Sequence, residues 1–183
     1  MVSDTTRHTG EVRIRAESVA DHEAIRRIVT AAFGRAAEAE LIDAVRRSPG
    51  YVPAMALVAE HGGTIVGHVM VSHTTLRALR GEHRVALLAP LAVAPDHQGR
   101  GVGAALVRAV AAVADERGEP ILLLEGDPAY YGRLGFEAAS NHGIALPLPT
   151  GVPADVAQVL PLSADDRELR GAVVYPSAFD DVT

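Results

Sequence analysis

The sequence predicts an α/β fold in which a mixed sheet carries helices on its faces. Two strand-like segments, Met55–Glu60 and Thr64–His73, are joined around Gly62-Gly63, which is a hairpin signal. An apolar strand over Arg84–Val93 then leads through a glycine-rich turn into a helical segment, Ala104–Arg117. A hairpin followed by strand–helix–strand is typical of a sheet with both antiparallel and parallel pairs.

The elements before the hairpin follow from the spacing of apolar residues. Val12–Arg15 alternates apolar and charged residues, as an edge strand does. Asp21–Phe33 has apolar residues at helical spacing, and Asp21 is placed to cap that helix. A second helical pattern runs through Leu41, Ile42 and Val45 and ends at Ser48-Pro49-Gly50.

Four short elements are expected after the long helix. Ile121–Leu124 is a fully apolar strand, and Pro128–Leu134 is a helical turn. Two further strand candidates, Val156–Leu160 and Ala172–Tyr175, lie among proline-rich segments. We expect residues 1–10 to be frayed and residues 11–183 to form one domain, with a strand-rich extension from about residue 140.

Composition narrows the class of protein. With 183 residues and 48% hydrophobic content, the chain can bury a proper core. A net charge of −6 argues against nucleic acid as a partner. No apolar run approaches the roughly 20 residues that cross a bilayer, and the N-terminus has no hydrophobic signal core, so we expect a cytoplasmic protein.

The absence of cysteine and of lysine from the sequence is informative. The chain has no cysteine, which excludes disulfides, thiol nucleophiles and cysteine-ligated metals, and its 8 histidines show no metal-ligand spacing. All 17 basic residues are arginine, which excludes a Schiff-base lysine and the lysine of a P-loop. Any bound phosphate must therefore be held by backbone amides and arginine, and no metal is expected.

The stretch Leu88–Gly103, which reads L-A-P-L-A-V-A-P-D-H-Q-G-R-G-V-G, carries the main functional signal. A strand, a glycine turn and a helix N-terminus follow one another directly. The first-turn N–H groups of a helix have no intrahelical partner, and the helix dipole adds partial positive charge there. Glycines at 99, 101 and 103 allow an anion to approach the main chain closely. This arrangement predicts a site for a phosphate or pyrophosphate.

Two motifs resemble those of the GNAT superfamily of N-acetyltransferases. Gln98-x-x-Gly101-x-Gly103 matches its Q/R-x-x-G-x-G/A signature, and Tyr131-x-x-x-Gly135-Phe136 falls where the superfamily has Y-x-x-x-G-F. The resemblance extends from about Val12 to Phe136, and the phrases Gly126–Phe136 and Tyr175–Phe179 look like a bacterial subgroup of predicted acetyltransferases. It implies a single domain with a mostly antiparallel sheet, in which a splayed strand pair forms the cofactor cleft.

The resemblance assigns a donor, acetyl-CoA, and the residues that hold it. Main-chain amides of Gly99–Ala104 would bind the pyrophosphate, and the backbone of Leu91–Val93 would pair with the pantetheine arm. Pro90 lacks an N–H and fits the bulge that the family has near this position. The implied cofactor residues are Leu91, Ala92, Val93, Gln98, Gly99, Arg100, Gly101, Val102, Gly103 and Ala104. For Arg100 the backbone amide is the contact expected.

The implied reaction is acetyl transfer to a primary amine by direct attack in a ternary complex, since no cysteine is present to carry an acetyl group. A backbone N–H near Val93 would stabilise the oxyanion. Tyr131 would protonate the departing thiolate, with Tyr130 as the alternative acid and a simple packing role as the other interpretation of Tyr131.

The sequence departs from the family at the general base. Ala89-Pro90-Leu91 provides no acidic residue on the cofactor strand, and Leu124 stands where an asparagine is frequent. Glu125, acting through water, is the first candidate for the base, and His68 is the second. The acceptor, a small-molecule or peptide amine, would be shaped by segments 31–53 and 141–160, and a homodimer is possible through the C-terminal strands.

Two other functions fit parts of the pattern. Gly99-x-Gly101-x-x-Ala104, with Glu125 about 20 residues later, satisfies a dinucleotide-binding fingerprint and would indicate an NAD(P)-dependent oxidoreductase. The linker Pro95–Gln98 between strand and glycines counts against it, as does the short chain that remains. A non-catalytic acyl-CoA-binding module is the third interpretation, and the sequence leaves open whether the acyl group is acetyl or longer.

Overall fold

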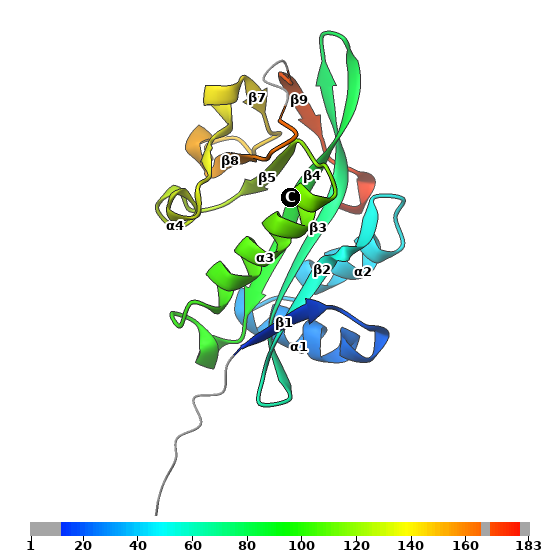
Figure 1. Ribbon diagram of the computed structural model, residues 1–183, viewed down its shortest axis with the longest axis vertical. Coiled ribbons are helices and arrows are strands. Elements are labelled where there is room, and N and C mark those ends of the chain that lie inside the picture. Colours follow the sequence, from blue (N-terminus) through cyan, green and yellow to red (C-terminus); the bar gives the residue numbers. More distant parts are fainter. Residues whose placement is uncertain (1–11, 166–168, 180–183) are drawn as a thin grey trace, which may run out of the picture.

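The computed structural model describes residues 12–165 and 169–179, so the predicted frayed segment 1–10 lies outside the described residues. Within them, nine strands form one sheet in the order β1-β2-β3-β4-β5-β8-β6, and β9 joins β3 and β7 (Figure 1). Only β4–β5 and β7–β9 are parallel among these pairs. The strands are β1 Arg13–Ala16, β2 Tyr51–His61, β3 Thr64–Ala78, β4 Gly81–Val93, β5 Ile121–Glu125, β6 Glu137–Ala138, β7 Ile144–Ala145, β8 Ala157–Pro161 and β9 Gly171–Val174.

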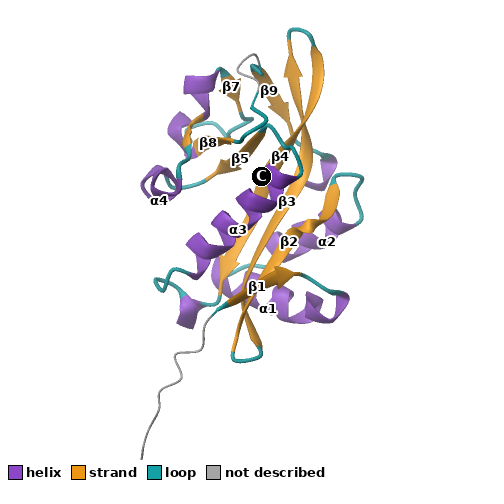
Figure 2. Ribbon diagram, in the orientation of Figure 1, coloured by secondary structure: helices purple, strands orange, loops and turns teal. Residues whose placement is uncertain are grey.

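The helices cover both faces of this sheet, as Figure 2 shows. They are α1 His22–Phe33, α2 Ala37–Arg46, α3 Val102–Glu116 and α4 Pro128–Tyr131. Strand residues alternate between two cores: Val58 and Met70 pack with α1 and α2, whereas Leu57 and Val69 pack with α3. The mixed, mostly antiparallel α/β fold is therefore confirmed. In the described part of the chain, no helix is long and apolar enough to cross a membrane.

Strands β4 and β5 separate after a short parallel contact. Among the described residues they pair only at Ala86–Leu122 and Leu87–Leu123, so no described strand pairs with the rest of β4 on the side of β5. On its other edge β4 carries a bulge, because Val69 pairs with Leu91 and Val71 already pairs with Leu88. The extra residue falls at Ala89-Pro90, which is a cis peptide. The expected bulge and the splayed strand pair are both present.

The bulge also decides which way the end of β4 faces. One additional residue reverses the alternation of side chains, since strand side chains have a period of two. Leu91 and Val93 therefore pack with the α3 core, and Ala92 packs with the α1–α2 core. This places the last residues of β4 beside the glycine-rich turn and the start of α3.

Some boundaries differ from the expectations. The β3–β4 hairpin continues through residues 74–83, which were not predicted as strand, and β9 pairs with its far end. Helix α3 begins at Val102, two residues earlier than predicted, with Gly101 as its N-cap. Asp21 occupies the N-cap position of α1, as expected, but its carboxylate makes no capping hydrogen bond to that helix and instead accepts hydrogen bonds from Arg15 (2.7 and 2.9 Å) and Ser18.

Candidate active site

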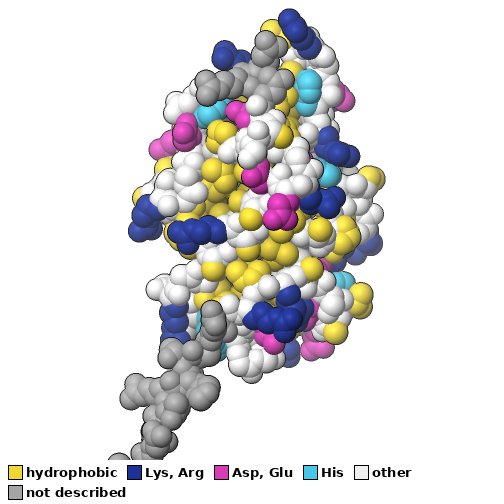
Figure 3. Space-filling model, viewed as in Figure 1, with side chains coloured by type: hydrophobic (Ala, Val, Ile, Leu, Met, Phe, Trp, Pro, Cys, Tyr) yellow, Lys and Arg dark blue, Asp and Glu magenta, His cyan; other side chains and the backbone are white. Residues whose placement is uncertain are grey.

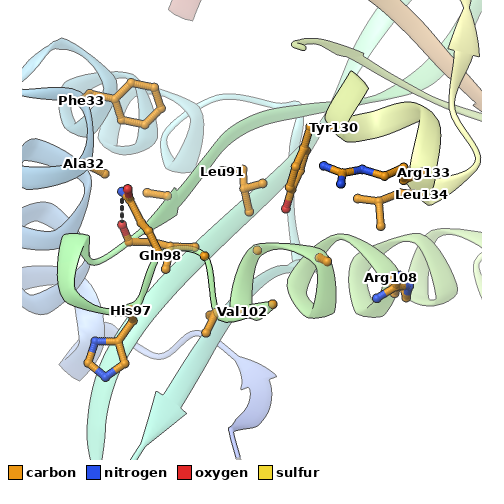
Figure 4. Close-up of a pocket in the computed structure, with 16 residues that line it drawn as sticks. Ala32, Phe33, Leu91, His97, Gln98, Val102, Arg108, Tyr130, Arg133 and Leu134 are labelled. Atoms are coloured by element: carbon orange, nitrogen blue, oxygen red, sulfur yellow. Dashed lines mark hydrogen bonds between the residues drawn. The ribbon is translucent and has the colours of Figure 1, made fainter. Parts of the chain in front are cut away.

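A cleft of about 810 Å³ opens where β4 runs into the glycine loop (residues 98–103), and we call it the glycine-loop cleft (Figure 4). The end of α1, the last residues of β4, the loop, the N-terminal half of α3 and the segment around α4 form its walls. The side chains and glycines that line it are Ala32, Phe33, Leu91, Ala92, Val93, His97, Gln98, Gly99, Gly101, Val102, Gly103, Ala104, Arg108, Tyr130, Arg133 and Leu134.

The glycine loop is folded back onto the end of β4. Gln98 Nε2 donates a hydrogen bond of 3.0 Å to the carbonyl oxygen of Val93 (Figure 4). Gly99 and Gly101 have φ values of 70° and 84°, a left-handed conformation that disfavours other residues. Residues 101–104, at the start of α3, line the cleft, where an anion would satisfy the unpaired N–H groups of the first turn.

Gly103 and Tyr130 meet at the start of α3. A Cβ atom added at Gly103 would lie 2.7 Å from the hydroxyl oxygen of Tyr130, so a side chain at 103 has no room unless that tyrosine moves. In Figure 4 the hydroxyl of Tyr130 points toward α3. Burial raises the pKa of Tyr130, which keeps its hydroxyl protonated and able to donate.

Two arginines that were not predicted from the sequence line the glycine-loop cleft. Arg108 on α3 and Arg133 after α4 line it, and basic side chains lie over these elements in the space-filling view (Figure 3). Among the residues that the structure describes, no acidic side chain lines this cleft. The spacing of four between Ala104 and Arg108 puts both on one face of a helix, which was the available signal for Arg108. Nothing comparable marks Arg133.

A second pocket, of about 390 Å³, adjoins the first, and we call it the carboxylate pocket. Phe33 and Leu91 line both, so the two spaces meet at the end of α1 and the end of β4. The residues that line the carboxylate pocket are Phe33, Arg35, Glu38, Leu41, Leu87, Leu88, Ala89, Pro90, Leu91, Glu125, Tyr131, Tyr175 and Phe179. Both predicted catalytic residues, Tyr131 and Glu125, are therefore brought together here.

Tyr131 is held by packing and not by hydrogen bonds. Its ring lies edge-on to Phe136, with centroids 5.6 Å apart, and covers the backbone of Gly126. Burial, with a smaller contribution from Tyr130, raises the pKa of Tyr131 to about 12. Its hydroxyl has no hydrogen-bond partner within the described segments. Tyr131 is thus a protonated, unengaged phenol at the wall of the carboxylate pocket.

Glu125 ends β5 and accepts a hydrogen bond from the hydroxyl of Tyr175. Burial and this hydrogen bond raise the pKa of Tyr175, so the phenol stays a donor. The other candidate base lies elsewhere: His68 is fully buried, bonds to Glu17 at 2.8 Å and lines neither pocket. The side chain of Arg100 is exposed and is not among the residues that line the cleft.

Comparisons with known proteins agree with this geometry. Residues 13–139 match the family described as Acetyltransferase (GNAT) domain. An Escherichia coli K12 protein, the uncharacterized N-acetyltransferase YjhQ, is 35% identical over 130 residues, which cover 70% of this chain and 72% of the relative.

Two crystal structures are similar over nearly the whole chain. Escherichia coli YhbS, a GNAT family N-acetyltransferase in complex with CoA, has a TM-score of 0.83 at 28% identity. The match covers 96% of this chain and 95% of the YhbS chain. A GNAT family acetyltransferase from Brucella melitensis in complex with acetyl-CoA has a TM-score of 0.75 at 30% identity. The match covers 93% of this chain and 99% of the Brucella chain. These matches reject the dinucleotide-binding alternative, and the chain belongs to the GNAT family of acetyltransferases.

Proposed function

We propose that the protein transfers the acetyl group of acetyl-CoA to a primary amine by direct attack in a ternary complex. The observation that carries this proposal is the contact between two pockets of opposite character. The glycine-loop cleft offers helix N–H groups and two arginines, and the carboxylate pocket offers Tyr131 and Glu125. Because Phe33 and Leu91 border both, a donor in one and an acceptor in the other would meet beside the end of β4.

The residues of the glycine-loop cleft fit acetyl-CoA as the acetyl-donor substrate. The amides of Gly99–Ala104 would hold the pyrophosphate, and Arg108 and Arg133 would add positive charge near the phosphates. The unpaired edge of Leu91–Val93 has backbone groups free to bond the amides of the pantetheine arm. Gln98 would act indirectly, by keeping the loop folded onto Val93.

The carboxylate pocket fits the proton transfers that the reaction requires. Glu125 would accept a proton from the ammonium group through water, which frees the electron pair of the nitrogen. The nitrogen would attack the thioester carbon, and an N–H near Val93 would stabilise the charge on oxygen. When the carbon–sulfur bond breaks, Tyr131 would protonate the sulfur. The second proton lost by the nitrogen would restore the phenol of Tyr131.

We take residues 11–183 as one acetyltransferase domain, with the segment from about 140 as an extension of it. The pairing of β9 with β3 and the position of Tyr175 beside Glu125 support this boundary, because both tie the extension to the sheet and to the pocket. The acceptor would be an amine, and a homodimer through the C-terminal strands stays a proposal.

Thermal unfolding with ligands tests the donor. CoA is expected to raise the melting temperature, and stabilisation by NAD without stabilisation by CoA would contradict the proposal. Thiol release from acetyl-CoA over a panel of amines then tests catalysis. Stabilisation by CoA with no thiol release for any amine would favour the acyl-CoA-binding module instead.

A further inference from the structure

Glu38 is a buried carboxylate in the carboxylate pocket with only one of its oxygens paired. It lies in the first turn of α2, and its side chain is 6% exposed. Oε1 accepts a hydrogen bond of 2.9 Å from Nε of Arg35, whereas Oε2 is buried without a hydrogen-bond partner among the described residues. Burying a charged oxygen without a partner is unfavourable, and Glu38 is one of the residues that line the pocket, so its unpaired oxygen points to a ligand that pairs with it there.

The charges around this pocket set the charge of that ligand. Arg35, Glu38 and Glu125 are the charged residues among those that line it. Arg35 is engaged with Oε1 of Glu38, and Glu125 is engaged with Tyr175. The three together carry a net charge of −1, which one positive charge would balance. A primary ammonium has three N–H donors, so one that pairs with Oε2 of Glu38 would still have a donor for Glu125 or water.

The remaining walls set the body of the ligand. They are mostly apolar and include Phe33, Leu41, Pro90, Tyr131 and Phe179. A volume of about 390 Å³ is at the low end of the range of small-molecule sites. A compact apolar group fits such a space, and a folded protein surface does not.

We propose that the acceptor is a monocationic primary amine on a compact apolar body, without a carboxylate of its own, and that Oε2 of Glu38 binds its ammonium group. A free carboxylate on the acceptor would add a third negative charge near Glu38 and Glu125 and would be rejected. Glu38 is then the residue that selects the acceptor, separate from Glu125, which receives the proton. This inference rests on the proposed function and names the substrate class of its second pocket.

Three matched amines test the class. 2-Phenylethylamine has the apolar body and one positive charge, phenylalanine adds a carboxylate, and phenylalaninamide adds a neutral group of the same size. We expect kcat/KM for 2-phenylethylamine to exceed that for phenylalanine by about 100-fold, with phenylalaninamide close to the amine. Equal or better use of phenylalanine would overturn the inference.

Two variants test the residue. Glu38→Gln keeps the size of the side chain, and it should weaken the binding of 2-phenylethylamine to the CoA-bound protein about 10-fold or more by calorimetry and raise its KM equally. Its affinity for CoA and its melting temperature should stay unchanged, which shows that the fold is intact. Glu40→Gln, an exposed carboxylate on the same helix, is the control and should alter none of these quantities.

Direct binding separates failure of the inference from failure of the proposed function. If the amine binds through Glu38 but no thiol is released, the transfer reaction is wrong and the inferred site stands. If amines are acetylated but Glu38→Gln binds and uses them like the wild type, the inferred site is wrong and the transfer reaction stands.

Discussion

Tyr130 and Tyr131 are consecutive residues of α4, with ring centroids 4.9 Å apart and ring planes at 89°, yet they line different pockets. One residue step turns a helical side chain by about 100°. The hydroxyl of Tyr130 therefore lies at the start of α3, against Gly103, while Tyr131 reaches the carboxylate pocket beside Glu125. Under the proposed function, Tyr130 would help to hold the donor and Tyr131 would take part in the chemistry.

Tyr131→Phe should lower kcat by about 100-fold or more without a change in the KM for acetyl-CoA, because it removes the acid that protonates the leaving sulfur. The pKa of about 12 predicts that the wild-type phenol stays protonated as the pH rises from 7 to 10. Titration of Tyr131 should therefore cause no loss of wild-type activity between pH 7 and pH 10. Initial rates over the pH range check both statements.

Tyr130→Phe is the matched control. It should raise the KM for acetyl-CoA and leave kcat close to that of the wild type, because its hydroxyl lies at the helix N-terminus and not at the carboxylate pocket. If Tyr131→Phe retains kcat, Tyr131 is a packed aromatic residue, and the acid is another group.

Gly103→Ala should impair donor binding with little change in stability, because a gain in helix propensity is offset by displacement of Tyr130. Alanine in a helix is more favourable than glycine by about 0.5–1 kcal/mol. The new Cβ, however, would lie 2.7 Å from the hydroxyl oxygen of Tyr130 and would occupy the approach to the first-turn amides. We expect a melting temperature close to that of the wild type and an affinity for CoA about 10-fold lower.

Gly132→Ala provides the comparison for this variant. Gly132 is exposed, its φ of −57° suits alanine, and an added Cβ would meet no atom within 4 Å. Its affinity for CoA should equal that of the wild type. Equal losses of affinity in both variants would show that the effect comes from glycine replacement in general and not from the approach to α3.

Arg108→Gln and Arg133→Gln should each weaken CoA binding about 5-fold, because each removes a positive charge from a cleft that must accept phosphates. The loss of affinity for CoA should become smaller as the salt concentration rises, since ions screen exposed charges. A short acetyl thioester that lacks phosphates should react equally well with the wild type and both variants. Arg117→Gln, on the exposed end of α3, is the control with the same change in net charge. Equal weakening by all three changes would contradict a specific role for the cleft arginines.

Local sequence was sufficient for the glycine loop, the strand before it and the helix after it. Glycines at positive φ, an apolar strand and an amphipathic helix are each determined within a few residues, so Gly99–Gly103 and Leu91–Val93 could be predicted. The extension of the hairpin through residues 74–83 could not be predicted. Exposed polar pairs such as Arg77 and Glu82 interrupt the alternation of apolar and polar residues that marks a strand.

The carboxylate pocket could be predicted only in part, because its walls come from segments that meet through tertiary packing. Tyr131 and Glu125 follow from motif and position. Tyr175 is 50 residues from Glu125 in the sequence, and the pairing of β9 with β3 and β7 places it there. Glu38 looks like any acidic residue in the first turn of a helix, and its burial is visible only in the folded chain.

A buried ionic cluster around Glu17, which contacts His68 of β3 and Arg46 of α2, gives a prediction about stability. Glu17 accepts hydrogen bonds from Nε2 of His68 (2.8 Å), Nε of Arg46 (2.9 Å) and the hydroxyl of Tyr51 (2.9 Å). Burial alone would raise the pKa of Glu17, but the hydrogen bonds from His68 and Arg46 outweigh it and lower the pKa to about 2. The ordinary value is 4.5, so folding favours the charged carboxylate.

The stabilisation from Glu17 should be complete above pH 4.5 and should be lost as the pH falls toward 2, because the unfolded chain takes up the proton first. The pKa difference corresponds to about 3 kcal/mol. Denaturant unfolding of the wild type and Glu17→Gln should therefore give free energies that converge by about this amount between pH 5 and pH 2. Glu23→Gln, on a side chain that is 84% exposed, should change the unfolding free energy by less than about 0.5 kcal/mol at pH 7. If the difference in unfolding free energy between the wild type and Glu17→Gln stays constant from pH 5 to pH 2, Glu17 acts through packing and not through its charge.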